Sequence, residues 1–187
     1  RYYSIAKINN DILLSIKWHP KGVCSTYLCT LKKGNILSGL IEKNSKFHFP
    51  KNAPSVLLVA NGTGIAPYLG MLHEIKNKPV QLIWGGRVEA SFDCYRSFFE
   101  SNSSKTPILK YELALSQIKD GQYVQDILLT KQIAIAKQLK QGGCIMLCGS
   151  LAMQHCVLNT LQQITTSHLN EQLSFFQNKS QLLLDCY

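Results

Sequence analysis

One stretch of the sequence constrains the fold more than any other: an apolar run at residues 55–60 followed directly by a glycine-rich turn. An unbroken apolar run is typical of a parallel strand that is covered on both faces. The turn leads into a helix predicted over residues 65–76 and reads Asn61-Gly62-Thr63-Gly64-Ile65-Ala66-Pro67. Glycines let the backbone approach a pyrophosphate closely, and a helix N-terminus supplies free N–H groups. We therefore predict a nucleotide-phosphate site here, although an ordinary strand–helix connection would also fit the turn.

The chain after residue 50 continues this alternation of strand and helix. No Lys-Ser or Lys-Thr pair follows the glycines, so the turn is not a P-loop. Repeated βα units predict a doubly wound parallel sheet with its ligand at the carboxyl ends of the strands. Further strands are predicted at 80–84, 108–115, 144–148 and 181–186, and further helices at 95–101, 124–129, 132–140 and 151–165.

Residues 1–50 have a different pattern. Short β-type runs are separated by Asn9-Asn10, Pro20-Lys21-Gly22 and Gly34-Asn35, which are turn sequences. One helix is predicted among them, beginning at Ser25 or Thr26 and ending at Gly34. The predicted strands are 2–6, 12–18, 36–41 and 47–49. We expect an α/β chain in which residues 1–50 form part of an antiparallel barrel and residues 51–187 form the doubly wound domain.

Composition excludes several classes of protein. No stretch of about 18 apolar residues and no apolar signal segment occurs, so we expect a cytoplasmic location and no membrane contact from this segment. The segment could still be the cytoplasmic part of a larger membrane protein. Seven cysteines at irregular spacing, without a CxxC pair, favour neither a disulfide framework nor a metal site. The net charge of +9 is not concentrated in a basic run interleaved with aromatic residues, so we expect no nucleic-acid partner.

Five motifs occur in the order and spacing of one family: Arg1-Tyr2-Tyr3-Ser4, Gly22-Val23-Cys24-Ser25, the turn at 62–67, Tyr123-Val124-Gln125 and Cys148-Gly149. With them the chain resembles the ferredoxin–NADP reductase-like FAD/NAD(P) module of diflavin reductases, the type found in the sulfite reductase flavoprotein subunit and NADPH–cytochrome reductase. The resemblance implies hydride transfer from NADPH, or NADH, to FAD. It also implies an FMN- or flavodoxin-like domain or protein as the electron acceptor, and a longer parent chain.

The resemblance implies an FAD-binding role for two of these motifs. In the first motif, Arg1 would pair with the flavin pyrophosphate, Tyr3 would stack on the isoalloxazine ring and Ser4 would hydrogen-bond near flavin N5. Gly22, Val23, Cys24 and Ser25 would lie under the FAD phosphates. The stretch Ser15-Ile16-Lys17 occupies a position that lines the flavin in the family, and Tyr187 would cover the flavin face. Taken alone, the first motif reads as an amphipathic strand and Ser25 as a helix cap.

Three polar residues would surround the hydride transfer according to the resemblance. They are Ser4, Cys148 at the end of a predicted strand, and Asp185 in the terminal Leu184-Asp185-Cys186-Tyr187. Cys148 would lie beside the nicotinamide C4. Without the family, a lone cysteine on a strand usually belongs to the core.

The nicotinamide nucleotide would contact the turn Gly62–Pro67 together with Arg87, Ser116, Gln117, Gln122, Tyr123, Gln125 and Cys148. NADPH-preferring members of the family have Arg where this chain has Gln117, and Lys where it has Gln122 or Gly121. Lys119 could substitute if the shortened loop brings it to the same place. We therefore expect a weakened preference for NADPH and the use of NADH.

Ser150 and Cys156 also replace acidic residues of the family. These departures, and the lack of the barrel strands that precede Arg1 in the family, leave a second interpretation open: a truncated, catalytically degenerate remnant that binds a nucleotide or a partner.

Overall fold

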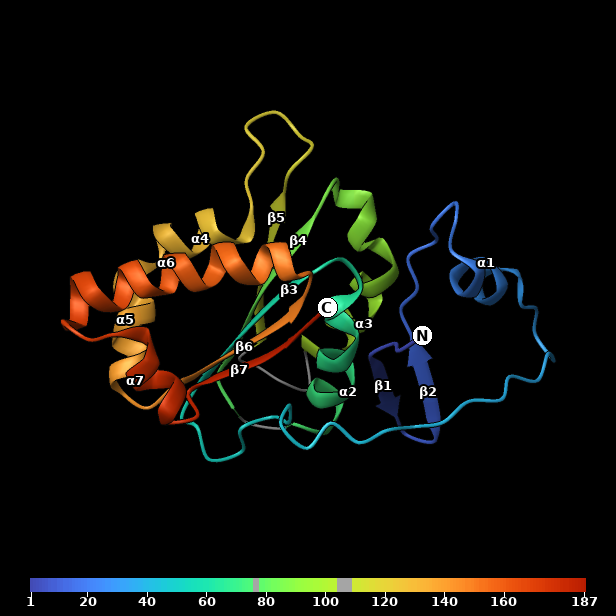
Figure 1. The fold of residues 1–187 in the computed structure, drawn as a ribbon, viewed down its shortest axis with the longest axis horizontal. Helices are drawn as coiled ribbons and strands as arrows, with labels where there is room; N and C mark the ends of the chain where they lie inside the picture. The colour runs from blue at the N-terminus through green and yellow to red at the C-terminus, as the bar shows by residue number, and fades with distance from the viewer. Residues whose placement is uncertain (76–77, 104–108) are drawn as a thin grey trace.

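The centre of the molecule is a five-stranded parallel sheet (Figure 1). A computed structural model describes residues 1–75, 78–103 and 109–187. The strand order is β5-β4-β3-β6-β7, so the chain proceeds outward from β3 to one edge and then from β6 to the other. The predicted doubly wound sheet is therefore confirmed, and the order reverses between β3 and β6. The strands are β3 (Val56–Asn61), β4 (Val80–Gly86), β5 (Leu109–Leu115), β6 (Cys144–Gly149) and β7 (Leu182–Cys186).

Helices cover both faces of this sheet because successive side chains of each buried strand point to opposite faces. Leu58 of β3 and Met146 of β6 pack with α2 and α3, whereas Leu57 and Ile145 pack with α4 to α7. The first face is covered by α2 (Ala66–Glu74), the 3₁₀ turn η2 (Glu89–Phe92) and α3 (Asp93–Ser103). The second face is covered by α4 (Val124–Thr130), α5 (Gln132–Lys140), α6 (Leu151–Leu169) and α7 (Leu173–Asn178).

The N-terminal segment packs against α2. It contains an antiparallel hairpin, β1 (Ile5–Ile8) and β2 (Asp11–Leu14), and the helix α1 (Val23–Thr30). A side-chain carbon on Gly70 of α2 would lie 2.9 Å from the backbone nitrogen of Lys7, so glycine permits the close approach of β1. Ala6 and Phe47 are buried in the same core as the first face of the sheet. Figure 1 shows the hairpin beside α2 and α1 farther from the sheet.

Several predicted elements of the N-terminal segment are wrong. Residues 36–41 and 47–49 have no regular structure, although they are apolar. A strand needs a partner for its N–H and C=O groups. No strand among residues 1–75, 78–103 and 109–187 pairs with this segment, and Ile36 and Leu40 are 90% and 86% exposed. Strand β1 covers residues 5–8 rather than the predicted 2–6, and β2 covers residues 11–14 rather than 12–18. The turn at Asn9, with φ of 56°, sets the register of the hairpin, whose four residue pairs end at Ile5 and Leu14.

The predicted helix boundaries also need correction in three places. Helix α1 starts at Val23 and ends at Thr30, before Gly34, and Ser25 lies within its first turn, where its hydroxyl donates to Gly22 O. Helix α6 extends to Leu169, and the short α7 was not predicted. The predicted end of the helix at 65–76 and the predicted start of the strand at 108–115 lie outside the described residues; the remaining predicted elements agree with the structure within two residues at each end.

Candidate functional site

The glycine turn lies where the strand order reverses, which is where α/β sheets bind their ligands. It forms the 3₁₀ turn η1 (Gly62–Ile65) at the carboxyl end of β3 and continues into α2. Gly62 adopts a left-handed conformation with φ of 53°. A side-chain carbon on Gly64 would lie 2.6 Å from the carbonyl carbon of Cys148, so only glycine lets the turn lie against the end of β6. The Trp84 indole donates to Gly62 O at 2.9 Å and fixes the other side of the turn.

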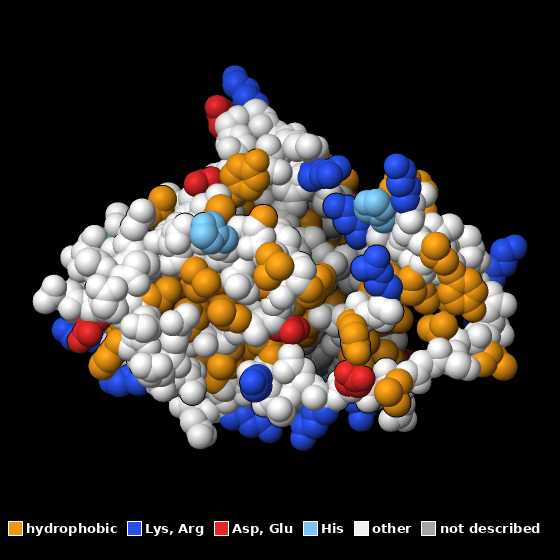
Figure 2. All heavy atoms as spheres, viewed as in Figure 1, with side chains coloured by type: hydrophobic (Ala, Val, Ile, Leu, Met, Phe, Trp, Pro, Cys, Tyr) orange, Lys and Arg blue, Asp and Glu red, His pale blue; other side chains and the backbone are white. Residues whose placement is uncertain are grey.

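A cleft of about 960 Å³ opens beside this turn. Figure 2 shows a hollow between the body of the sheet and the α1 side, with Lys and Arg side chains gathered near its rim. The predicted site residues that line the cleft are Ser15, Ile16, Lys17, Gly62, Thr63, Arg87, Ser116, Tyr123 and Gln125. The volume is within the range of ligand and cofactor sites. Predicted flavin-binding and nucleotide-binding positions therefore share one cleft.

Other predicted nucleotide-site residues lie behind this surface. Gly64, Ile65, Ala66 and Pro67 are buried in the start of α2 and its packing. Gln117 and Gln122 are exposed and do not line the cleft. Their backbone N–H groups donate to Arg87 O and Leu115 O at 2.8 and 2.9 Å, so they shape the loop between β5 and α4.

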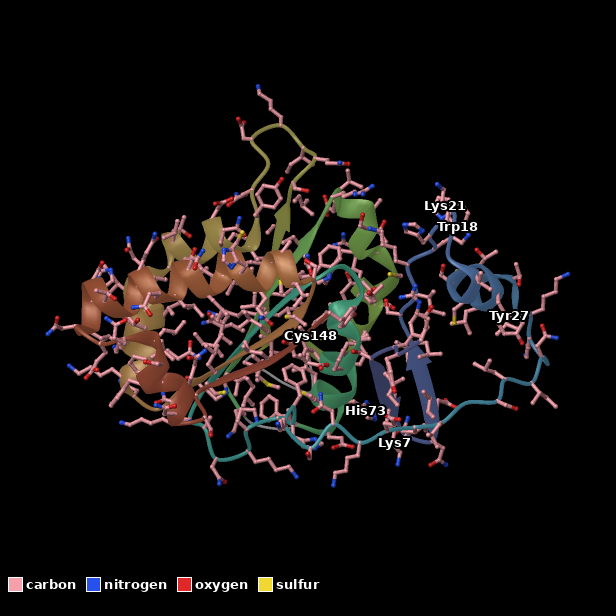
Figure 3. The ribbon with its side chains drawn as sticks, in the orientation of Figure 1. Lys7, Trp18, Lys21, Tyr27, His73 and Cys148 are labelled. Carbon is pink, nitrogen blue, oxygen red and sulfur yellow. The ribbon has the colours of Figure 1, made fainter. Side chains whose placement is uncertain are left out.

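Ser4, Cys148, Asp185 and Tyr187 meet at the carboxyl ends of β6 and β7. Cys148 is fully buried, and its thiol donates to Asp185 Oδ2 at 3.9 Å. Burial raises the pKa of Cys148 most, the nearby Asp185 charge raises it further, and a hydrogen bond with the Ser4 side chain lowers it. The Cys148 thiol is therefore neutral at physiological pH. Figure 3 shows Cys148 centrally placed, at the sheet end near the start of α2.

Tyr187 connects this cluster to the glycine turn. Its backbone N–H donates to Gly149 O at 2.9 Å, and its hydroxyl lies 3.4 Å from Thr63 Oγ1. Burial raises the pKa of Tyr187, and hydrogen bonding with Thr63 and Ser4 opposes that rise. Tyr187 is 59% exposed, so the last residue is partly open to solvent beside the turn.

The other predicted flavin residues are arranged around the N-terminal segment. The side chains of Tyr3 and Cys24 are hydrogen-bonded, so the first two motifs lie in contact. This hydrogen bond raises the pKa of Tyr3. Arg1 is exposed, Tyr2 and Val23 are 86% and 87% exposed, and Gly22 is the N-cap of α1. In Figure 3, Trp18, Lys21 and Tyr27 lie around α1, away from Cys148.

The cleft also contains residues to which the sequence analysis assigned no role, among them Tyr95, Trp84, Cys94 and Asn61, the last named only as the first residue of the predicted turn. Tyr95 on α3 hydrogen-bonds to Ser15 across 80 positions of sequence, and burial raises the pKa of Tyr95 to about 12. Asn61 bonds to Ser150 across 89 positions, and Trp84 and Cys94 line the same cleft. The position of Asn61 at the end of a buried strand could have identified it. Tyr95 and Cys94 had no comparable signal, because they lie within an ordinary amphipathic helix.

All seven cysteines are free thiols. Among residues 1–75, 78–103 and 109–187, no group of three or more His, Cys, Asp or Glu side chains is placed to hold a metal ion. Within the same ranges, every helix is too short or too polar to cross a membrane.

The family model for the oxidoreductase NAD-binding domain matches residues 58–159, which include the glycine turn, the β4–α3 connection and the end of β6. The chain belongs to this oxidoreductase NAD-binding family. The resemblance to the ferredoxin–NADP reductase-like module is thereby confirmed, and so is the α/β fold class. The cleft described above therefore opens at the switch point of the sheet of an oxidoreductase NAD-binding domain.

Several nitric oxide synthases are similar to this NAD-binding chain. Nitric oxide synthase 3 of Sus scrofa is 33% identical over 167 residues, which cover 81% of this chain and 14% of the synthase. The inducible nitric oxide synthases of Homo sapiens and Cavia porcellus are 34% and 32% identical over 184 and 183 residues, 86% of this chain and 16% of each synthase. The chain therefore spans about one-sixth of the length of these relatives.

Proposed function

We propose that the chain is the FAD- and nicotinamide-binding module of a flavin-dependent reductase that transfers hydride from NADPH or NADH to FAD. The observation that carries the proposal is the meeting of Ser4, Cys148 and Asp185 beside the dinucleotide cleft. The two cofactors, when bound, supply the hydride chemistry, while the protein binds, orients and shields them. The module would belong to a longer electron-transfer protein.

The residues around the cleft fit a nicotinamide dinucleotide. The absence of a side chain at Gly64 keeps the turn against β6, and Gly62 and Thr63 line the cleft beside it. Arg87 lines the cleft as a cation suited to phosphate oxygens. Ser116, Tyr123 and Gln125 offer hydroxyl and amide groups near the β5–α4 loop. Gln117 lies outside the lining and carries no charge, which supports a weakened selectivity for the NADPH 2′-phosphate.

The polar trio would act by position rather than by strong acid or base chemistry. The neutral Cys148 thiol donates to Asp185, and the Asp185 carboxylate also accepts from the Asn44 amide at 3.0 Å. These bonds hold the carboxylate on one side of the thiol, with Ser4 on another. Because Cys148 is excluded from water, small charge shifts near it are stabilised by fixed dipoles.

We propose that residues 1–50 contribute to FAD binding and that residues 51–187 bind the nicotinamide nucleotide. Ser15, Ile16 and Lys17 line the shared cleft, and the contact between Tyr3 and Cys24 joins the two flavin motifs. The other residues proposed to bind FAD are Arg1 and Tyr2 of the first motif, Gly22, Val23 and Ser25 of the second, and Tyr187, whose hydroxyl lies close to Thr63 of the glycine turn. The acceptor of electrons would be an FMN- or flavodoxin-like domain or protein, whose acidic surface would suit the +9 charge of this chain.

Stopped-flow reduction of the FAD-reconstituted protein tests this function. NADPH or NADH should bleach the flavin absorbance. Ser4→Ala and Cys148→Ala should each slow bleaching roughly 10- to 100-fold, the effect of one lost hydrogen bond to a charged or polarised group, with little change in KM. Cys144→Ala and Ser174→Ala are matched controls, because Cys144 is buried at the opposite end of β6 and Ser174 is exposed on α7. Equal rates in all four variants would remove the catalytic assignment.

A second candidate function is nucleotide binding without turnover. The strong exposure of Tyr2 and Val23, two residues of the predicted flavin motifs, favours it. A protein that binds NADH or NADPH but retains no FAD under any reconstitution condition would support this second function over the first.

A further inference from the structure

Ser150 and Asn61 form a two-bond contact across the crevice between β3 and β6. The backbone N–H of Ser150 donates to Asn61 Oδ1 at 2.9 Å. The other end of the amide, Asn61 Nδ2, donates to Ser150 Oγ at 3.0 Å. Because a backbone N–H can only donate, the oxygen of the Asn61 amide must face it, and the orientation of the amide is fixed by chemistry. Gly149 permits the contact, since a side-chain carbon there would meet the Asn61 side chain.

The hydrogen bonds that reach Ser150 Oγ also fix the direction of its proton. Besides the Asn61 amide, the backbone N–H of Met153 donates to Ser150 Oγ at 3.3 Å, as expected for the N-cap of α6. A hydroxyl oxygen has two lone pairs and one proton. Both lone pairs are occupied by N–H donors, so the hydroxyl proton remains available only for donation. Within the described part of the chain, no acceptor is bonded to it, and Ser150 and Asn61 both line the cleft.

We propose that the Ser150 hydroxyl is a dedicated hydrogen-bond donor to a pyrophosphate oxygen of the bound dinucleotide, and that Asn61 is the positioning residue that keeps it a donor. The inference rests on the proposed function, and it identifies the pyrophosphate as the part of the ligand that Ser150 binds. An anionic oxygen suits the position, because the first turn of the 19-residue helix α6 adds a favourable dipole. The family that the chain resembles has an acidic residue at the position of Ser150, so this chain has a hydroxyl donor where the family has a negative charge.

Binding of ADP-ribose, measured by calorimetry, tests the proposal without any hydride transfer. ADP-ribose contains the pyrophosphate and lacks the nicotinamide, and three variants separate ligand contact from helix capping. Ser150→Thr keeps the hydroxyl and the cap, and should bind within about threefold of the wild type. Ser150→Asp keeps an N-cap acceptor but has no proton to donate and adds a negative charge. It should retain the melting temperature while its affinity falls roughly 10- to 100-fold.

Ser150→Ala removes both the donor and the cap. Its affinity for ADP-ribose should fall roughly 10- to 100-fold, because the hydrogen bond to the charged pyrophosphate is lost. It should also melt about 2–4 °C lower, because the helix cap is lost. The proposal is overturned if Ser150→Asp binds ADP-ribose as tightly as the wild type, because the hydroxyl then serves only the helix. A wild-type protein that binds neither ADP-ribose nor NADH refutes the proposed function itself, and this inference with it.

Discussion

Replacement of Gly64 by alanine should destabilise the protein by about 3 kcal/mol, the upper end of the range for overpacking. The new methyl carbon would lie 2.6 Å from the Cys148 carbonyl carbon and 2.7 Å from Gly149 Cα, and closer still to the Cys148 oxygen. All three atoms belong to the backbone of β6, which is hydrogen-bonded to β3 and β7. The clash therefore cannot be relieved by turning a side chain, and the turn has to move away from the sheet.

Gly62→Ala is the matched control, because it lies two residues away in the same turn. No atom lies within 4 Å of a side-chain carbon at Gly62, and its cost comes only from the left-handed backbone at φ of 53°. That cost is about 1 kcal/mol. The two glycines are thus needed for different reasons, and the expected loss of stability is about three times larger at Gly64.

Thermal unfolding followed by circular dichroism measures both variants. For a chain of this size, each 1 kcal/mol lowers Tm by about 2–4 °C, so Gly64→Ala should melt about 6–12 °C lower and Gly62→Ala about 2–4 °C lower. NADH affinity should also fall more in Gly64→Ala, because the turn is displaced from the crevice. Equal losses of Tm in the two variants would refute the argument that close packing on β6 requires glycine at position 64.

Three further predictions concern charge, pH and the indole contact. Gln117→Arg should raise kcat/KM for NADPH relative to NADH roughly tenfold, as expected for one charge-assisted bond to the 2′-phosphate; an unchanged ratio of the two kcat/KM values would place the 2′-phosphate elsewhere. Burial raises the pKa of Cys144 to about 12 and also raises that of Cys148, whereas an unfolded thiol ionises near pH ~8.5. The stability that these neutral thiols contribute is complete below that pH and is lost as pH rises toward 12, so the urea midpoint should fall from pH 8 to 10, and less steeply in Cys144→Ala; parallel profiles would contradict this linkage. Trp84→Phe leaves Gly62 O without its indole donor and should cost about 1–3 kcal/mol in urea unfolding, and a variant as stable as the wild type would show that water replaces the bond.

The parallel sheet could be predicted from the sequence because its central strands are buried on both faces. Residues 56–60 and 144–149 are entirely buried, and a strand in that environment must be apolar throughout. The helix after the glycine turn was equally predictable, since Pro67 near its start is compatible with a first turn. In these segments the local pattern and the final environment agree.

The N-terminal segment was less predictable because its environment depends on distant contacts. The apolar residues at 36–41 have the composition of a strand, but none of the strands in the described part of the chain pairs with them. Composition alone cannot supply that partner. The same limit applies to the cleft, where Ser15 meets Tyr95 and Asn61 meets Ser150, because spacing along the chain does not determine which loops meet at the sheet edge.

Gly149 explains why the cluster of Cys148 and Asp185 lies beside the cleft. Its φ of 147° turns the chain between Cys148, which faces the buried cluster with Asp185, and Ser150, which faces the cleft. Its carbonyl accepts from the Tyr187 backbone, which holds the last residue beside the glycine turn. Any side chain there would also push against Asn61. One conformationally unusual glycine therefore directs the neutral thiol and the Ser150 hydroxyl to different sides of the chain, and under the proposed function the nicotinamide would lie near Cys148 and the phosphates near Ser150.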